Sequence, residues 1–217
     1  MGLTTAFAIH REDSTNMYLN VIKVMVMTLG VAAVVRTRKE ILGLVSVIAL
    51  SLAFYGAKGG WFTLITGGAF RVWGPPSTVI EGNNELAVGL IITIPLLYYM
   101  VLQADKLLEL PWLEKIGIKW LKRSIVILML LCAISAIGSH SRGALLAMIA
   151  MATMLWWRSK SKLAVGLVVL LLSPALIFFM PDEWSSRMGT IQTYETDQSA
   201  MGRINAWTMA INIANNR

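Results

Sequence analysis

Long apolar runs separated by short basic connectors make up most of this chain. A helix needs about 20 apolar residues to cross a hydrocarbon core of roughly 30 Å. The pattern predicts six membrane-spanning helices, at residues 17–35, 41–57, 84–102, 124–137, 144–157 and 163–180. We therefore expect an all-α fold, a polytopic transmembrane helical bundle with loops outside the membrane, and one membrane domain over residues 1–217.

Composition supports this fold class. Of the 217 residues 56% are hydrophobic and only 14% are charged, which is less charge than a soluble domain of this size carries. The net charge of +7 first suggests a nucleic-acid partner. The cations instead cluster between the apolar runs, as they do in membrane proteins. We expect a membrane partner and no nucleic acid.

The stretch Ile137-Gly-Ser-His-Ser-Arg142-Gly-Ala-Leu145 separates the fourth and fifth spans. A continuous helix over 124–157 would be about 50 Å long at ~1.5 Å per residue, too long for one crossing. We predict a tight reversal, eased by Gly138 and Gly143. Arg142 then lies at the membrane face, and an arginine in lipid costs roughly 2.5–3.5 kcal/mol or more. It either snorkels to a headgroup or forms an anion site.

The basic residues also predict the orientation of the spans. The connectors 36–39, 103–123 and 158–162 hold eleven Lys and Arg, against seven spread over the longer segments on the other side. The positive-inside rule places the connectors in the cytoplasm. The glycine-rich loop 58–83, the Arg142 turn and the last segment then share the outer face.

Local signals predict where several helices begin. Asn83 and Asn84 are candidate N-caps of the third span, and Pro95 should kink it. Pro111 can open an amphipathic helix that lies on the membrane before the fourth span. Ser199 is the candidate cap of a later helix.

Five of the cations on the outer face are candidates for binding an anion, namely Lys58, Arg71, Arg142, Arg187 and Arg203. Arginine suits phosphate because its planar fork donates two parallel hydrogen bonds and keeps its proton. On its helix, Arg203 shares an apolar face with Trp207. If Arg142 and Arg203 meet, they would bind a lipid pyrophosphate; each could instead be a separate surface charge.

Other features of the outer face leave two interpretations open. The aromatic residues of loop 58–83 suit a membrane-interface belt or a wall for a glycan. His140 either fills the turn or acts as a base. The carboxylates have no metal-ligand spacing with the two histidines, so we expect no metal and no cofactor.

Three runs in the first half of the chain resemble one known family, the O-glycosylation ligases associated with the exosortase A system. These runs are Phe54-Tyr-Gly-Ala-Lys58-Gly-Gly-Trp-Phe-Thr63, Arg71-Val-Trp-Gly-Pro-Pro76 and Glu81-Gly-Asn-Asn-Glu85-Leu-Ala. From about residue 124 onward the chain is similar to the wider O-antigen ligase and polymerase superfamily. The motifs that carry this similarity are Ser141-Arg142-Gly-Ala and Gly202-Arg203-Ile-Asn-Ala-Trp207.

The resemblance implies transfer of a glycan from undecaprenyl pyrophosphate to a hydroxyl of a lipid or protein acceptor. The reaction would take place at the periplasmic face of a bacterial inner membrane, without a metal or a nucleotide sugar. The resemblance assigns the pyrophosphate to Arg142 and Arg203. We expect further substrate contacts from Lys58, Arg71, His140, Arg187 and Trp207. Family members extend further at both ends, so the chain is expected to be a fragment.

Two alternative functions stay open at this stage. A polymerase of polysaccharide repeat units differs from a ligase only in its acceptor. A transporter or flippase for a lipid-linked glycan would use the same arginines, but it would need a polar path through the bundle.

The predicted orientation can be tested with reporter fusions. A fusion at Lys160 should report the cytoplasm, and fusions at Arg71 and Asp197 should report the periplasm. A cytoplasmic signal at Asp197 would remove Arg203 from the face that carries Arg142.

Overall fold

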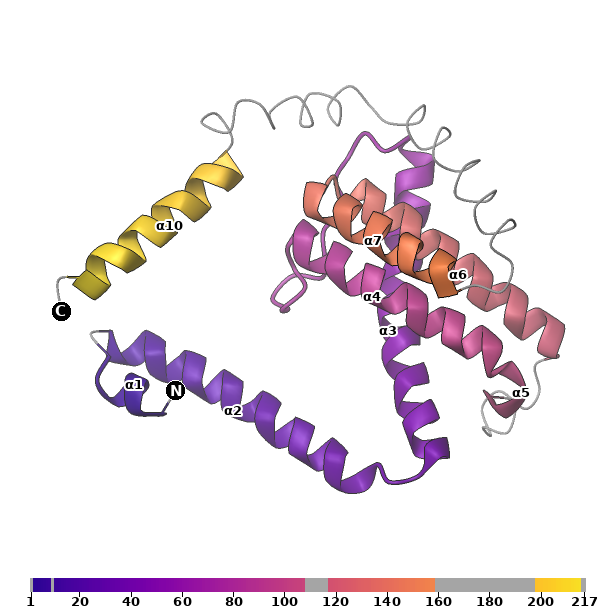
Figure 1. The fold of residues 1–217 in the computed structure, drawn as a ribbon, viewed down its shortest axis with the longest axis horizontal. Coiled ribbons are helices and arrows are strands. Elements are labelled where there is room, and N and C mark those ends of the chain that lie inside the picture. Colours follow the sequence, from indigo (N-terminus) through magenta and orange to yellow (C-terminus); the bar gives the residue numbers. More distant parts are fainter. Residues whose placement is uncertain (1, 9, 108–116, 159–197, 216–217) are drawn as a thin grey trace. The chain divides into compact units, whose positions relative to one another are not determined.

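The computed structural model of the chain describes residues 2–8, 10–107, 117–158 and 198–215. All regular structure in these ranges is helical (Figure 1), which confirms the predicted fold class. Four described helices are long and apolar enough to cross a membrane, namely α2 (Arg11–Val34), α3 (Arg38–Ile65), α4 (Asn83–Leu102) and α6 (Ile118–Gly138). The fifth predicted span is α7 (Arg142–Arg158), with 17 residues. The sixth lies outside the described residues.

The chain divides into two compact units, residues 1–48 and 49–217. In the first unit, α1 (Gly2–Ala6) packs against α2, and Arg11 Nη2 donates to the Ala6 carbonyl at 3.2 Å. No residue of α2 is buried within the protein. Its apolar side chains are therefore open to lipid, as expected of a helix that crosses a membrane.

The start of α3 is fixed by a capping box. One carboxylate oxygen of Glu40 accepts the backbone N–H groups of Arg36 and Thr37, both at 2.8 Å. In return, the Thr37 hydroxyl accepts the Glu40 N–H at 3.2 Å. These bonds satisfy backbone donors that the first turn of a helix leaves unpaired.

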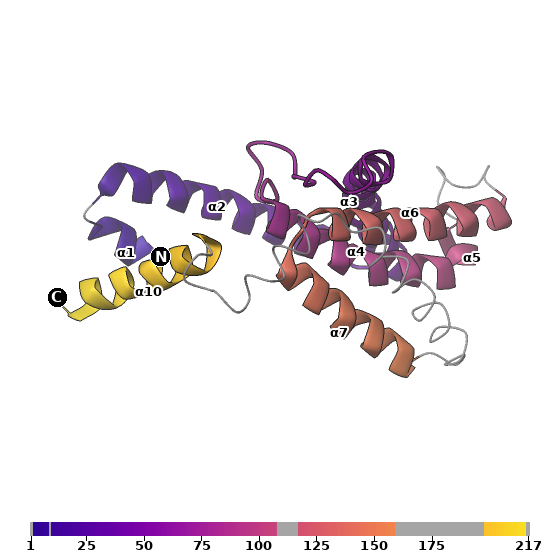
Figure 2. The ribbon, with the colours of Figure 1, turned by 90° about the horizontal axis from the view of Figure 1, so that it is seen from above.

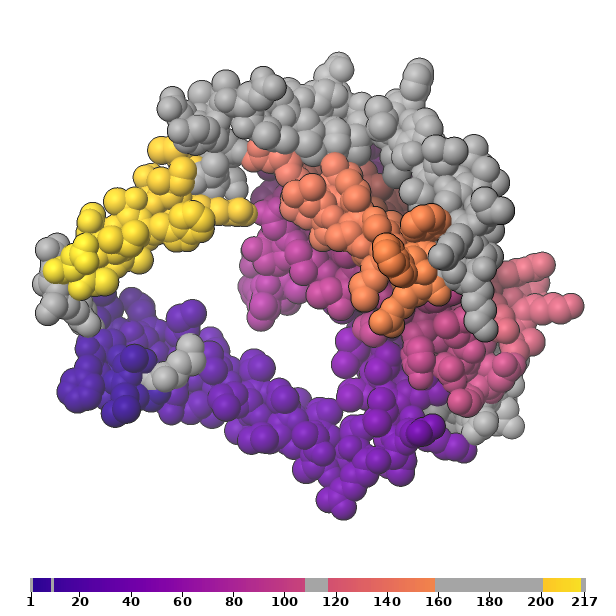
Figure 3. Space-filling view, viewed as in Figure 1, coloured from indigo at the N-terminus to yellow at the C-terminus, as the bar shows by residue number. Residues whose placement is uncertain are grey.

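In the second unit, α4 packs along α6 (Figures 1 and 2). The buried face of α4 repeats every three or four residues, at Leu86, Leu90, Thr93, Leu97 and Met100, the period that keeps side chains on one side of a helix. Helix α6 in turn buries Ile125, which is 2% exposed. Helix α7 packs against both α4 and α6, and its surface lies in front of α4 in Figure 3.

Helices α3 and α6 approach closely because α3 has no side chain at the contact. A Cβ atom added to Gly60 would collide with the backbone carbonyl of Leu131, and one added to Gly59 would meet the Ser135 hydroxyl. Small residues at such spacing allow two backbones to pack closely in a membrane. We call this contact the glycine seam.

The glycine seam also sets the direction of the two helices. Gly56 of α3 lies against Cys132 of α6, and Thr63 of α3 lies against Gly138 of α6. Residue numbers rise together along both helices, so α3 and α6 run in the same direction. Their C-terminal ends therefore meet, which confirms that the segment after α3 and the α6–α7 turn share one side of the bundle.

Two predicted boundaries near α3 and α4 were wrong. The second span was predicted to end before Lys58, but α3 continues to Ile65. Its glycines do not break the helix because they lie in the seam. The N-cap of α4 is Gly82, with no side-chain hydrogen bond, and Asn83 is already helical.

The fourth span also begins earlier than predicted. Helix α6 starts at Ile118, so the last part of the expected surface helix belongs to the membrane-spanning helix itself. Residues 108–116, which include Pro111, lie outside the described residues. Between α4 and α6, a short helix α5 (Ala104–Leu107) packs against both.

The reversal after α6 is confirmed, but its mechanism differs from the prediction. Helix α6 ends at Gly138 and α7 begins at Arg142. The backbone angle φ of 54° lies at His140, and neither Gly138 nor Gly143 has a positive φ. Gly138 is needed instead for the close approach of Thr63. Helix α10 (Gln198–Asn215) begins one residue before Ser199, so that residue is not its cap.

The glycine seam gives a direct stability test. Gly60→Ala would force a methyl group into a backbone carbonyl, and overpacking of this kind costs about 1–3 kcal/mol. We expect the midpoint of thermal unfolding in detergent to fall by several degrees.

Gly43→Ala in the same helix is the matched control, since a Cβ there meets nothing within 4 Å. Alanine is the better helix former, so this variant should be unchanged or more stable. A Gly60→Ala protein as stable as the Gly43→Ala protein would contradict the seam.

Candidate functional site

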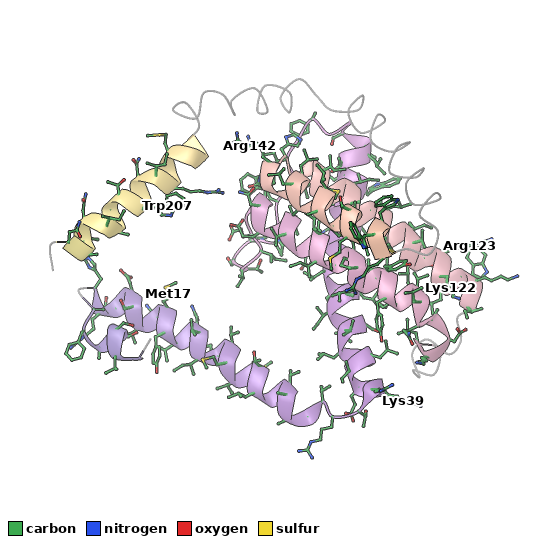
Figure 4. The ribbon with its side chains drawn as sticks, in the orientation of Figure 1. Met17, Lys39, Lys122, Arg123, Arg142 and Trp207 are labelled. Carbon is green, nitrogen blue, oxygen red and sulfur yellow. The ribbon has the colours of Figure 1, made fainter. Side chains whose placement is uncertain are left out.

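The candidate site lies at the turn end of the bundle, which we define as the end where α6 gives way to α7. Figure 4 shows Arg142 there, at the start of α7, and Lys122 and Arg123 at the opposite end of α6. The first turn of α4 and the segment after α3 meet at the same end. The predicted anion-binding residue therefore lies where four segments converge.

Serine side chains fix the turn internally. The Ser139 hydroxyl donates to the Ala136 carbonyl at 2.6 Å and accepts the Ser141 N–H at 3.3 Å. The Ser141 hydroxyl accepts the N–H of Ala144 at 3.2 Å. That last bond is an N-cap for α7. Arg142, the first residue of α7, is thus held on both sides by serine hydrogen bonds.

Three consecutive residues of the turn are also held from outside. The Gly138 carbonyl accepts the N–H of Val72 at 2.9 Å. The Ser139 carbonyl accepts the side-chain amide of Asn83 at 2.8 Å. These carbonyls lie at the end of α6, where the helix leaves them without partners of its own. The segment after α3 and the start of α4 therefore complete the end of α6.

The third external bond comes from His140. Its Nε2 donates to the Gly68 carbonyl at 2.9 Å, and the ring is only 5% exposed. A carbonyl only accepts, so Nε2 carries the proton in this contact. His140 therefore links the turn to the loop between α3 and α4 through this hydrogen bond, and Nε2 is not available as a base.

The loop between α3 and α4 is closed by Glu81. Its backbone carbonyl accepts the N–H of Gly74 at 2.9 Å, and its carboxylate accepts the N–H of Ser77 at 2.9 Å. Trp73 and Phe70 are exposed beside this closure. The aromatic surface is thus open, as both the membrane belt and the glycan wall require.

Of the predicted site residues, Arg142 and Arg71 lie at or near the turn, whereas Lys58 does not. Arg142 is half-buried, and so is Arg71, which precedes the Val72 that bonds to Gly138. Lys58 is exposed on α3, and its Nζ lies 5.8 Å from the ring centroid of Phe54, one turn back along the helix. The Lys58 side chain therefore points away from the turn end.

The remaining predicted residues lie further along the chain. Arg203 and Trp207 are exposed on α10, four residues apart and so on one face. The meeting of Arg142 with Arg203 stays a prediction. Arg187 lies outside the described residues.

Sequence reasoning missed the role of Asn83. An asparagine pair before an apolar run is typical of a helix cap. The sequence pattern therefore gave no sign that Asn83 binds the carbonyl of Ser139, 56 positions away. No group of three or more potential metal-ligating side chains occurs in the parts of the chain that the structure describes.

Comparison with known families assigns a class to this region. Residues 127–217 match the family model of O-antigen ligases. The match supports an O-antigen ligase or polymerase type of function and indicates a glycosyltransferase-like ligase in general. The matched residues include both Arg142 and Arg203. Residues 1–104 match a family of unknown function (DUF5935). No curated protein and no solved structure matches the chain.

The contacts at the turn end connect these two matched regions. The O-antigen ligase region contributes residues 138–142. The residues that bind the turn from outside, Gly68, Val72 and Asn83, belong to the N-terminal matched region. The N-terminal region therefore holds in place the part of the ligase region that carries Arg142.

Two substitutions separate the contribution of the His140 backbone conformation to stability from that of its side-chain hydrogen bond. His140→Gly loses the bond to Gly68 but adopts the positive φ without strain. His140→Ala loses the same bond and keeps the strain of a left-handed residue, about 1–2 kcal/mol. We expect both variants to unfold at lower temperature than the wild type, with Ala the less stable. Equal stability of the two would show that the backbone conformation at residue 140 carries no cost.

Proposed function

We propose that the protein is a glycan ligase. It transfers an oligosaccharide or polysaccharide from undecaprenyl pyrophosphate to a hydroxyl of a lipid or protein acceptor, at the periplasmic face of a bacterial inner membrane. The observation that carries the proposal is the position of Arg142. It begins α7 at a turn that is fixed by the six hydrogen bonds described above, within the region that matches the O-antigen ligase model.

The chemistry of the transfer requires positive charge at one place. The acceptor oxygen bonds to the anomeric carbon of the glycan while the bond from that carbon to the pyrophosphate oxygen breaks. The acceptor loses its proton to a base, and negative charge grows on the departing pyrophosphate. A guanidinium already in position binds this charge more tightly in the transition state than in the ground state, which lowers the barrier.

Arg142 and Arg203 are the two residues that we assign to this task. Arg142 lies at a fixed helix start, and Arg203 lies beside Trp207 on a helix whose apolar side chains are exposed. We propose that the two guanidiniums bind one pyrophosphate, with Arg71 and Trp207 close to the glycan. His140 supports the turn in this scheme and does not take the acceptor proton through Nε2.

The distribution of charge favours a ligase over a transporter. Among the described residues, the buried polar side chains are serine, threonine and His140, and no Asp, Glu, Lys or Arg is buried. A charged lipid headgroup that crosses the bundle would need polar partners along its path. Arg142 instead lies at a helix start and Arg71 in a loop, while Arg203 is exposed on α10, which suits chemistry at the surface of the membrane.

Lysine substitutions test the pyrophosphate site. Lysine keeps the charge but not the two-pronged geometry of arginine. We expect Arg142→Lys and Arg203→Lys each to lower glycan transfer roughly 10- to 100-fold, the worth of one charge-assisted hydrogen bond. Transfer is measured in membranes with a lipid-linked glycan donor, and protein level is measured in the same samples.

Arg158→Lys is the matched control, because Arg158 lies in the last turn of the same helix as Arg142. An arginine that only contacts headgroups tolerates lysine, so this variant should keep normal transfer. Near-normal transfer by Arg142→Lys or Arg203→Lys would show that the arginine in question is a membrane anchor.

A further inference from the structure

Asn83 makes a contact that its position in the sequence does not explain. Its side-chain amide donates to the Ser139 carbonyl at 2.8 Å. Helix α4 begins at Asn83, and its N-cap is Gly82, which has no side chain. The Asn83 amide is directed to the end of α6, 56 residues further along the chain.

The acceptor of this bond lies at the start of a short chain of hydrogen bonds that leads to Arg142. Ser139 also accepts the Ser141 N–H through its hydroxyl, and the Ser141 hydroxyl caps α7 at Ala144. Ser139 and Ser141 are both buried. A shift of the Ser139 backbone would therefore be transmitted to the first turn of α7.

We infer that Asn83 is a positioning residue for Arg142: by holding the Ser139 carbonyl, it fixes the start of α7 and so the direction of the guanidinium. The inference rests on the proposed function, since it assigns Arg142 a reaction in which its orientation matters. A bidentate contact is sensitive to small displacements, and a misplacement of about 1 Å can cost roughly 100-fold in rate.

Residues of the N-terminal matched region hold the turn that carries Arg142. Gly68 and Val72 bind the two residues on either side of Ser139 through their backbone groups. Asn83 is the member of this set that uses its side chain to reach the turn from the N-terminal region. It is therefore the position at which one substitution removes a contact without changing the backbone.

The first part of the experiment compares Asn83→Asp with Asn84→Asp. Both changes add one negative charge to the first turn of α4, which favours negative charge in either case. Only the first removes the amide donor and sets a carboxylate oxygen against the Ser139 carbonyl. Asn84 is exposed and serves as the matched control.

The structural readout is amide hydrogen exchange in detergent, followed by mass spectrometry of the peptide that covers residues 139–145. We expect Asn83→Asp to speed exchange in this peptide and to leave exchange in the middle of α4 unchanged. Asn84→Asp should match the wild type in both places. Unchanged exchange in Asn83→Asp would overturn the inference, whatever the protein catalyses.

The functional readout is a double-mutant cycle with Arg142→Lys, in the glycan transfer assay. Alone, Asn83→Asp should lower transfer about tenfold or more. In the Arg142→Lys protein the same change should cost less than about twofold, because residues that act as one unit are not additive. Full additivity would overturn the inference, since it would show that Asn83 supports the fold without acting through Arg142.

The two proposals fail in different ways. If the wild type transfers no glycan while Asn83→Asp still loosens residues 139–145, the ligase function is wrong and the hold of Asn83 on the turn is supported. If the wild type transfers glycan and the cycle is additive, the ligase function stands and Asn83 is not a positioning residue.

Discussion

The close approach of α3 and α6 is the contact on which the rest of the second unit depends. Helices in lipid gain little from hydrophobic association, because lipid chains are as apolar as the side chains. Close packing must supply the attraction, and Gly59 and Gly60 allow it by leaving room for the Leu131 carbonyl and the Ser135 side chain. Larger residues there would separate the two backbones.

This approach determines what happens at the turn end. Because α3 and α6 run in the same direction, the segment after α3 emerges beside the end of α6. Val72 can then bind the Gly138 carbonyl, and Gly68 can accept from His140. The left-handed conformation of His140 is kept because its ring is buried and bonded, which offsets a strain that glycine would have avoided. The glycine seam therefore positions the loop after α3, the loop holds the turn after α6, and the turn positions Arg142.

Under the proposed function, the candidate site follows a principle common to enzymes that stabilise a developing charge. The guanidinium has to be in place before the charge develops, so the residues that matter include those that hold the backbone around it. Here those residues come from the region that matches a family of unknown function, while Arg142 comes from the O-antigen ligase region. These contacts give the N-terminal matched region a structural role at the turn that carries Arg142.

The sequence by itself determined the fold class, the approximate positions of four membrane-spanning helices and the reversal at Arg142. Hydrophobic runs and the cost of arginine in lipid are local properties, so they can be read without a structure. Tertiary structure alone decided three other features: that Lys58 lies within α3 and turns back to Phe54, that His140 links the turn to the loop, and that Asn83 binds Ser139. Each depends on a partner distant in the chain, or on a helix continued through its glycines by packing against α6. Residue spacing along one segment carries no information about such partners.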